Sequence, residues 1–293
     1  MGFIKSITER LATGQKPPAI RYADFSAPAP EDLLPHLDQS GIDEASLTPD
    51  QKQWRRDGVL ILRDFIPDEI TAPYIKRREA HPNPAGWPQG NSYQFVPEMR
   101  ELALYPPLMQ KLEHLIGEQM MLQLCLTNWV TSQRAWHQDD YLNPSFVNCW
   151  YVAVWIALAD IEPDCGPFEY IPGSHRWPLM RGEKVRGILG DLGHEVHELH
   201  WPKTSECFTT PAVEYEMKLR RVKPEAFLAK RGDVLVWHAR LMHQGSLAKT
   251  RGKERRSLIA HYSGVNHRPD IPGQSRFQDE NGQIYIKFGD PTA

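Results

Sequence analysis

Apolar residues recur along this chain at two spacings, and each spacing predicts one kind of element. Helical spacing with start and stop signals predicts helices over residues 46–57, 66–80 and 97–117. The first helix opens on Thr48 and Pro49, which suit a helix N-terminus, and ends before Gly58. Compact apolar runs predict strands at residues 59–62, 122–130, 150–158, 168–171, 234–237 and 257–262.

The order of these elements indicates the fold class. The predicted strands are short and separated by turn residues, which is typical of a sandwich or a barrel. The helical patterns precede the strands instead of alternating with them, so a parallel sheet is not expected. The sequence therefore predicts a mainly β protein with flanking helices (α+β).

Three further segments surround this pattern within a main domain at residues 46–264. Residues 1–45 contain several prolines and are expected to form an extended N-terminal arm. A polar stretch at about residues 176–230 is expected to be an insertion between strands, partly helical at 211–221, of the size that often covers a site. In the tail, residues 265–293, a turn at 279–283 predicts a hairpin whose second strand is 284–286.

Charge and cysteine content make some classes of function less expected than others. The 293 residues include 34 Lys and Arg against 37 Asp and Glu, a net charge of −3, and no basic stripe predicts nucleic-acid binding. The four cysteines form no Cys-x-x-Cys pair, and with no leader pattern they predict reduced thiols in a cytoplasmic protein. The sequence does not indicate the oligomeric state.

An apolar stripe near the N-terminus is expected to pack on the protein itself, with contact to a membrane surface as the alternative; its residues are Phe3, Ile4, Ile7 and Leu11.

The chemistry is concentrated in the segment Trp136-His137-Gln138-Asp139. On an extended strand, His137 and Asp139 would point to the same side. One more histidine from a distant strand would complete two imidazoles and one carboxylate, a set that suits non-haem Fe(II) and leaves positions open for O₂. The distant histidines that compete for this role are His238, His243 and His261.

Several short motifs in a fixed order resemble the phytanoyl-CoA dioxygenase family of Fe(II)- and 2-oxoglutarate-dependent oxygenases. They span residues 46–264 and are Arg55-Arg56-Asp57-Gly58-Val59-Leu60, His137-Gln138-Asp139, Trp155-Ile156-Ala157-Leu158, Gly166-Pro167, Ile171-Pro172-Gly173-Ser174-His175, Gly232-Asp233, His243 and Arg255-Arg256-Ser257. The resemblance implies a double-stranded β-helix core of the jelly-roll or cupin type.

The resemblance also implies roles for single residues. It gives His137, Asp139 and His243 as metal ligands. The family places an arginine about a dozen residues after the distal histidine, which here is Arg255, to bind the remote carboxylate of 2-oxoglutarate through two parallel hydrogen bonds. Further candidates for the co-substrate are Ser257, Trp155, Gln133 and Asn128, and candidates for the substrate are Arg134, Tyr141, Asn143 and His175.

These roles predict an enzyme that hydroxylates an unactivated C–H bond of a small, polar molecule and releases succinate and CO₂. Asp139 favours hydroxylation because halogenating relatives carry a small residue there. Two departures from the family pattern are the 106-residue spacing from His137 to His243 and Gln244, which separates His243 from Gly245 and Ser246. The alternative is a β-barrel that binds a metal or another ligand without catalysis, which would not need Arg255 and Ser257.

Overall fold

A computed structural model describes residues 18–28, 33–83, 85–87, 90–127, 129–196 and 200–287 of the chain. Two features of the sequence lie outside the described residues: the apolar stripe at residues 3–11 and the co-substrate candidate Asn128.

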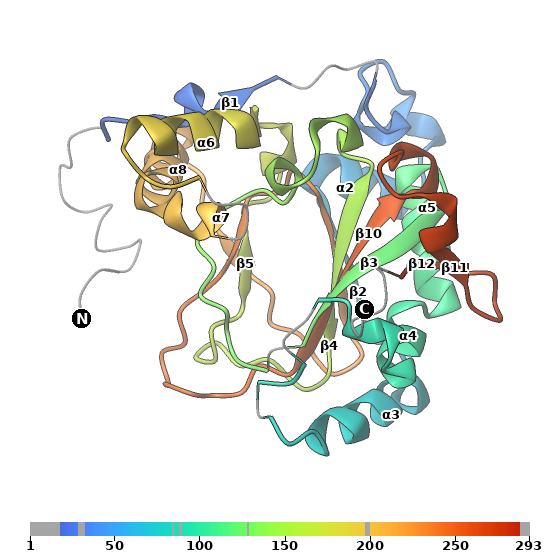
Figure 1. The fold of residues 1–293 in the computed structure, drawn as a ribbon. Helices are drawn as coiled ribbons and strands as arrows, with labels where there is room; N and C mark the ends of the chain where they lie inside the picture. The colour runs from blue at the N-terminus through green and yellow to red at the C-terminus, as the bar shows by residue number, and fades with distance from the viewer. Residues whose placement is uncertain are drawn as a thin grey trace.

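Two β-sheets face each other and form the core (Figure 1). The major sheet has seven strands in the order β11 (Arg276–Gln278), β12 (Ile284–Ile286), β3 (Met120–Leu126), β10 (Ser257–Gly264), β4 (Tyr151–Ala157), β8 (Val234–His238) and β2 (Val59–Leu62). The minor sheet has the order β7 (Glu225–Ala226), β5 (Phe168–Tyr170) and β9 (His243–Gly245). Neighbouring strands are antiparallel except for the pair β12 and β3, so the expectation of a mostly antiparallel fold is confirmed.

Strand β4 shows how the two faces of the major sheet are used. All seven of its residues are buried, as the continuous apolar run predicted. Val152, Val154 and Ile156 pack with the helices on the outer face. Ala153 and Trp155 face the minor sheet and pack with Phe168 and Tyr170, so the inner face lies between the sheets.

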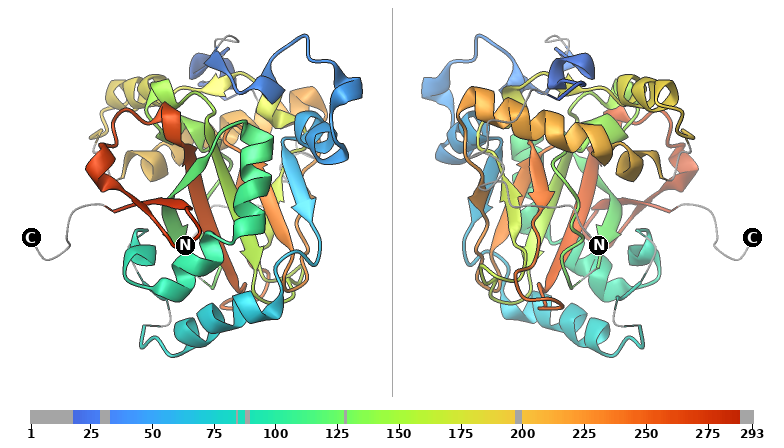
Figure 2. Two further views of the ribbon diagram at one scale, coloured as in Figure 1. Left: turned by 90° about the vertical axis from the view of Figure 1, so that its right-hand side faces the viewer. Right: turned by 90° about the vertical axis from the view of Figure 1, so that its left-hand side faces the viewer.

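Helices α2 (Pro49–Asp57), α3 (Asp68–Glu79), α4 (Pro97–Ala103) and α5 (Pro106–Ile116) contribute to the outer side of the major sheet (Figure 2). The predicted start and stop of α2 are confirmed, because Thr48 accepts from the Gln51 backbone and Gly58 adopts φ +69°. The single helix predicted over 97–117 is wrong. Pro106 keeps Tyr105 out of the helical conformation, at φ −49° and ψ 117°, so the chain forms two helices there.

The region at residues 176–230 is more helical than the sequence pattern indicated. It contains strand β6 (Leu179–Met180) and helices α6 (Gly182–Asp191), α7 (Trp201–Thr204) and α8 (Glu206–Arg220). Helix α8 begins before the expected 211 and keeps Pro211 inside it. Its buried Phe208 packs edge-on against Phe25 of the N-terminal segment, and β1 (Ser26–Ala27) pairs with β6. The first described residues therefore hold this helical layer in place.

The hairpin expected in the tail is present, with β11 and β12 antiparallel and Asp279 closing the turn. Within the described residues, no helix is long and apolar enough to cross a membrane. Short 3-10 helices connect the larger elements: Tyr22–Asp24, His36–Asp38, Glu44–Ser46, Ser92–Gln94, Asp140–Leu142, Ser145–Val147, Ser174–Arg176, Val265–His267 and Gly273–Ser275.

Candidate metal centre

The loop that carries His137 is joined to strand β9 by a single antiparallel bridge. The backbone N–H of His137 donates to the His243 carbonyl at 3.0 Å, and the N–H of His243 donates back to the His137 carbonyl at 3.0 Å. This bridge brings together two residues that are 106 positions apart in the sequence. The pair of imidazoles therefore depends on backbone pairing between the loop and the minor sheet.

His137 and Asp139 do not share an extended strand, so that part of the sequence argument is wrong. Asp139 has φ −74° and ψ −30° and is the residue before a 3-10 helix that starts at Asp140. The chain turns immediately after the bridge, because the Asp140 N–H donates to the carbonyl of Ala239 at 2.9 Å. The turn, rather than strand alternation, brings the carboxylate beside the two rings.

Three ligand atoms converge at this point. Nε2 of His137 lies 3.4 Å and Nε2 of His243 lies 3.7 Å from Oδ1 of Asp139. One ligand atom from each residue lies within 4.8 Å of the other two, and all three side chains are buried. Two imidazoles and one carboxylate in this arrangement match the ligand set of non-haem Fe(II) sites.

Each imidazole is oriented by its other nitrogen. Nδ1 of His137 is 2.7 Å from the carbonyl oxygen of Ala135, and Nδ1 of His243 is 2.9 Å from that of Leu241. A carbonyl can only accept, so both rings carry their proton on Nδ1. Both Nε2 lone pairs then point to the place where the carboxylate lies, as metal binding requires.

Trp237 orients the carboxylate, and the sequence analysis did not single it out. Its Nε1 donates to Oδ2 of Asp139 at 2.8 Å, which leaves Oδ1 on the side of the imidazoles. The signal that could have found it is strand alternation: Leu235 and Trp237 both face inward on β8. Phe168 stacks on His243 with ring centres 5.1 Å apart and covers the other side of that ring.

Gln138, between two of the converging residues, is fully buried and was also missed. Its Nε2 donates to the Arg240 carbonyl at 2.9 Å, and its Oε1 accepts from the Met180 N–H at 2.8 Å. It therefore ties the loop both to the segment before β9 and to the start of the helical layer.

Burial and neighbouring charge act together on this cluster. Burial alone would raise the pKa of Asp139, but the surrounding imidazoles of His243, His137 and His261 hold that pKa well below its ordinary value. Burial lowers the pKa of His243 to about 3, with the Asp139 charge opposing the shift. An ionised carboxylate beside a neutral imidazole is the protonation state that metal ligands need.

Arg255 lies at the other end of the inner face. It is buried; its Nη1 donates to the Gly166 carbonyl at 2.8 Å, and its guanidinium carbon is 5.9 Å from the centre of the Trp155 ring. Its Nε and the Trp155 Nε1 are fully enclosed and have no hydrogen-bond partner in the described part of the chain. Burial lowers the pKa of Arg255 to about 10, so the group stays charged at neutral pH. Unpaired buried donors of this kind are uncommon and call for a specific explanation.

Both the backbone conformation and the close packing at position 166 require a glycine. It has φ +77°, and a Cβ there would lie 2.6 Å from the Ser246 carbonyl oxygen. The close approach lets its own carbonyl accept from Arg255. The Ser246 hydroxyl donates to the Pro167 carbonyl at 2.8 Å, which accounts for its side chain.

The other co-substrate candidates differ in their position. Ser257 is buried and pairs with Ala157, so both face the minor sheet. Trp155 is fully buried on the same face. Gln133 is exposed, lies in a loop and not on a strand, and has φ +52°.

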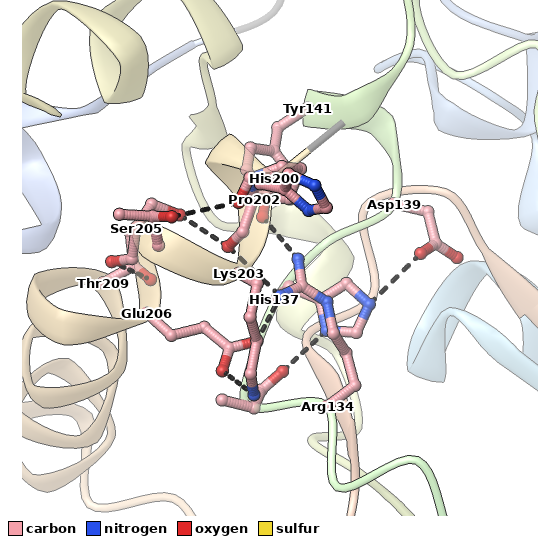
Figure 3. A network of polar contacts seen from close by, with 12 residues as sticks. Arg134, His137, Asp139, Tyr141, His200, Pro202, Lys203, Ser205, Glu206 and Thr209 are labelled. Atoms are coloured by element: carbon pink, nitrogen blue, oxygen red, sulfur yellow. Dashed lines mark hydrogen bonds and ion pairs between the residues drawn. The ribbon is translucent and has the colours of Figure 1, made fainter. Parts of the chain in front are cut away.

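The substrate candidates fall into two groups. Arg134 bonds to Glu206 and to the Pro202 carbonyl, and its Nη2 donates to the Tyr141 hydroxyl at 2.9 Å, so both residues join the metal loop to α7 and α8 (Figure 3). Asn143 donates to the Asp139 carbonyl at 3.4 Å. His175 lies elsewhere: its Nε2 contacts the Arg55 carbonyl at 3.2 Å and its ring packs on His238.

Comparison with known proteins agrees with this geometry. Residues 54–257 match the sequence model of the phytanoyl-CoA dioxygenase family, described as Phytanoyl-CoA dioxygenase (PhyH). The chain belongs to the phytanoyl-CoA dioxygenase family. The predicted enzyme class, a 2-oxoglutarate-dependent dioxygenase that uses iron, is confirmed.

Relatives are distant in sequence. The chain is 21% identical to the human peroxisomal phytanoyl-CoA dioxygenase over 287 residues, covering 86% of this chain and 79% of that protein. EctD from S. alaskensis with bound Fe has a similar structure, with a TM-score of 0.59 at 18% identity, covering 87% of this chain and 89% of the other. The epimerase SnoN, in complex with Fe³⁺, alpha ketoglutarate and nogalamycin RO, has a TM-score of 0.56 at 21% identity and covers 85% of this chain and 98% of the other. These structures confirm the double-stranded β-helix fold; the barrel is not closed.

Proposed function

We propose that His137, Asp139 and His243 hold Fe(II) and that the enzyme hydroxylates a C–H bond of a small, polar molecule. The observation that carries the proposal is the convergence of their three ligand atoms within 4.8 Å, on the same inner side of the fold as Arg255. Bound iron, with 2-oxoglutarate and O₂, supplies the oxidation of the C–H bond and releases succinate and CO₂.

The protein's part is to prepare this site before the reactants arrive. The carbonyls of Ala135 and Leu241 keep both imidazoles in one tautomer, and Trp237 holds one oxygen of the carboxylate. With three protein ligands, an octahedral ion would keep positions for the co-substrate and O₂. Phe168 and Trp237 cover the His243 ring and limit access of water.

Arg255 is the proposed partner for the remote carboxylate of 2-oxoglutarate. Its Nη1 donates to the Gly166 carbonyl, its Nε and the Nε1 of Trp155 are both unpaired, and its guanidinium carbon is 5.9 Å from the centre of the Trp155 ring. Ser257, on the same inner face, would add a hydroxyl donor. A charge-assisted contact in a buried place is strong and fixes the orientation of the diacid. A barrel that only binds a ligand would not require this buried, partly unpaired arginine.

The substrate candidates Arg134, Tyr141 and Asn143 support a polar molecule. They surround the loop after His137, and the helical layer at residues 182–220 reaches this loop through Glu206. We infer that this layer forms one wall of the substrate site. His175 contacts Arg55 and His238 and is not needed for this role.

The direct test is succinate formation by purified protein that depends on both Fe(II) and 2-oxoglutarate. Arg255→Gln should raise the KM for 2-oxoglutarate by roughly 10-fold to 100-fold, the loss expected for one charge-assisted contact. Arg256→Gln is the matched control, because Arg256 bonds to Glu79 and Glu254 on the outside. Equal KM values for both variants, or turnover without Fe(II), would refute the proposal.

A further inference from the structure

His261 is a buried histidine beside the metal cluster that none of the roles above uses. It lies on β10 opposite Ala153, whose side chain packs between the two sheets, so His261 faces inward as well. Its ring centre is 5.7 Å from that of Trp237, the residue that donates to Asp139. Both Asp139 and His137 are close enough to act on its charge state.

One nitrogen of the His261 ring makes a hydrogen bond within the described part of the chain, and the other does not. Nδ1 lies 2.7 Å from the hydroxyl oxygen of Tyr151, a contact buried on all sides. Nε2 makes no hydrogen bond within the described part of the chain, and it is not among the fully enclosed polar atoms there. His261 as a whole is 7% exposed. A histidine this deeply buried, with one accessible and unpaired nitrogen, has a polar group available for a ligand.

The next inward-facing polar residue on β10 provides a contrast. Ser263 is fully buried and accepts from Nη1 of Arg268 at 3.1 Å. Arg268 is itself paired with Asp270 through two hydrogen bonds. These polar groups satisfy one another, whereas Nε2 of His261 does not take part in such a network.

The direction of the Tyr151–His261 hydrogen bond decides what Nε2 can do. Burial raises the pKa of the Tyr151 phenol, so the phenol keeps its proton, and burial lowers the pKa of His261, so the ring is neutral. Asn143 donates from its amide nitrogen to the Asp139 carbonyl at 3.4 Å, which connects it to the metal loop. A phenol O–H is a stronger donor than an imidazole N–H, and an imidazole nitrogen is a stronger acceptor than a phenol oxygen, so the Tyr151 proton goes to Nδ1 and the ring proton lies on Nε2.

We propose that His261 is a substrate-specificity residue whose Nε2–H donates to an acceptor oxygen on the substrate beside the metal centre. The inference rests on the proposed function and narrows the substrate to molecules with a carboxylate, amide or hydroxyl oxygen near the carbon that reacts. Tyr151 and Asn143 are positioning residues, because they act through the tautomer and orientation of His261 and through the Asp139 loop.

The first experiment measures the tautomer. Protein with ¹⁵N-labelled histidine is loaded with Zn(II), which is diamagnetic, and with 2-oxoglutarate, and His261 is assigned by the resonance lost in His261→Asn. The expected result is a neutral ring with its proton on Nε2, and an Nε2 resonance that moves when isobutyrate or isobutyramide is added but not with tetramethylammonium, which has no acceptor. A proton on Nδ1, or an Nε2 resonance that neither oxygen compound moves, overturns the proposal.

The second experiment distinguishes a hydrogen bond donated by Nε2 of His261 from simple packing of its ring. His261→Asn keeps a polar group near Nδ1 for Tyr151 but has nothing at Nε2, whereas His261→Gln places an amide nitrogen near the Nε2 position. Saturation-transfer NMR on the isobutyrate methyl groups should show binding weakened about 10-fold or more by His261→Asn and mostly restored in His261→Gln. His267→Asn is the matched control, since that ring stacks on Trp150 and bonds to Glu118 outside the inner face.

Equal weakening by both His261 variants would mean that the ring only fills space, and it would overturn the proposal. The failure of the proposed function is distinguishable: it would appear as no Fe(II)- and 2-oxoglutarate-dependent succinate formation in the unmodified protein. The tautomer in the zinc-loaded protein would still report on His261 in that case.

Discussion

Two clusters in this fold have the same composition, two histidines and one aspartate, yet their chemistry differs. The metal cluster consists of His137, Asp139 and His243. The second cluster consists of His175, His238 and Asp38, with the two rings 5.3 Å apart and Asp38 bonded to His238 at 2.9 Å. Both are buried. Among the described residues, only the metal cluster brings three ligand atoms together.

The difference lies in where the unused imidazole nitrogens point. In the second cluster, Nδ1 of His238 accepts from the Arg240 N–H at 3.0 Å and its Nε2 donates to Asp38. His175 directs Nε2 to the Arg55 carbonyl; its Nδ1 has no hydrogen-bond partner among the described residues and is enclosed against Gly58. In the metal cluster, backbone carbonyls occupy only Nδ1 of each ring. Residue types are therefore insufficient for a metal site; the unused lone pairs must also point to one place.

The largest expected effect comes from Asp139→Ala. Removal of this carboxylate takes away one of the three proposed ligands, so Fe(II) binding and succinate formation should fall more than about 100-fold, beyond the effect typical of residues that only support a ligand. Metal analysis after desalting and a succinate assay measure the two losses. Asp38→Ala should keep full iron content; if it lost iron as well, the distinction between the clusters would be wrong.

Trp237→Phe should have an intermediate effect. The ring volume is largely kept, but Oδ2 of Asp139 loses its donor and the carboxylate is free to rotate. We expect Fe(II) affinity to fall by roughly 10-fold to 100-fold, as for other groups that orient metal ligands. Titration of the metal-free protein with Fe(II) under anaerobic conditions gives the value. Unchanged affinity would mean that the loop alone orients the carboxylate.

Asp38→Ala should affect the free energy of unfolding instead of metal binding. The change leaves the Nε2–H of His238 buried without an acceptor, which costs about 1–3 kcal/mol. Urea unfolding of the metal-free protein measures the loss. Asp160→Ala is the control, because Asp160 pairs with Lys230 on the surface. A loss no larger than that of the control would show that the second cluster adds nothing to stability.

An effect of similar size to that of Asp38→Ala, but confined to acidic pH, is expected from His175. Burial lowers its pKa to about 3 in the folded protein, below the ordinary value near 6.5. The unfolded chain therefore takes up a proton first, so stability is lost as pH falls from about 6.5 toward 3 and is unaffected above 6.5. By pH 5 this single group contributes a loss on the order of 2 kcal/mol.

The measurement is urea unfolding in chelator between pH 7 and 5, with the wild type compared with His175→Gln. The variant should lose less stability over this interval, because Gln does not titrate. Parallel profiles for the wild type and His175→Gln would contradict the depressed pKa.

A helix could be predicted from the sequence when the residues that determine its start and end lie within a few positions of each other. Helix α2 could be predicted because its cap, first proline and terminal glycine act within a few residues. The break between α4 and α5 was equally local, at Pro106, but the apolar spacing across it concealed it. Helix α6 includes Gly182, Gly187 and Gly190 and has weak helical propensity, so it depends on Val185 and Leu189 packing against other elements.

At the metal cluster, too, local sequence signals were informative and contacts between distant residues were not predictable. Motif order was enough to propose His137, Asp139, His243 and Arg255, and the first three converge in the structure. The sequence did not reveal how the first two converge, because this depends on a backbone bridge to β9 and a turn bonded to Ala239. Nor did it reveal the donor Trp237 or the unpaired Nε2 of His261, since hydrogen-bond partners far apart in the chain leave no local pattern.

The amino-acid order alone determined the buried strands, the fold class and the residue types available for iron chemistry, because side-chain polarity and backbone preference act over short distances. Tertiary structure alone decided which imidazole lone pairs point to one shared place and which are hydrogen-bonded or enclosed elsewhere. The physical reason is that the use of an imidazole depends on the direction of its hydrogen bonds, and those partners meet only after the chain has folded.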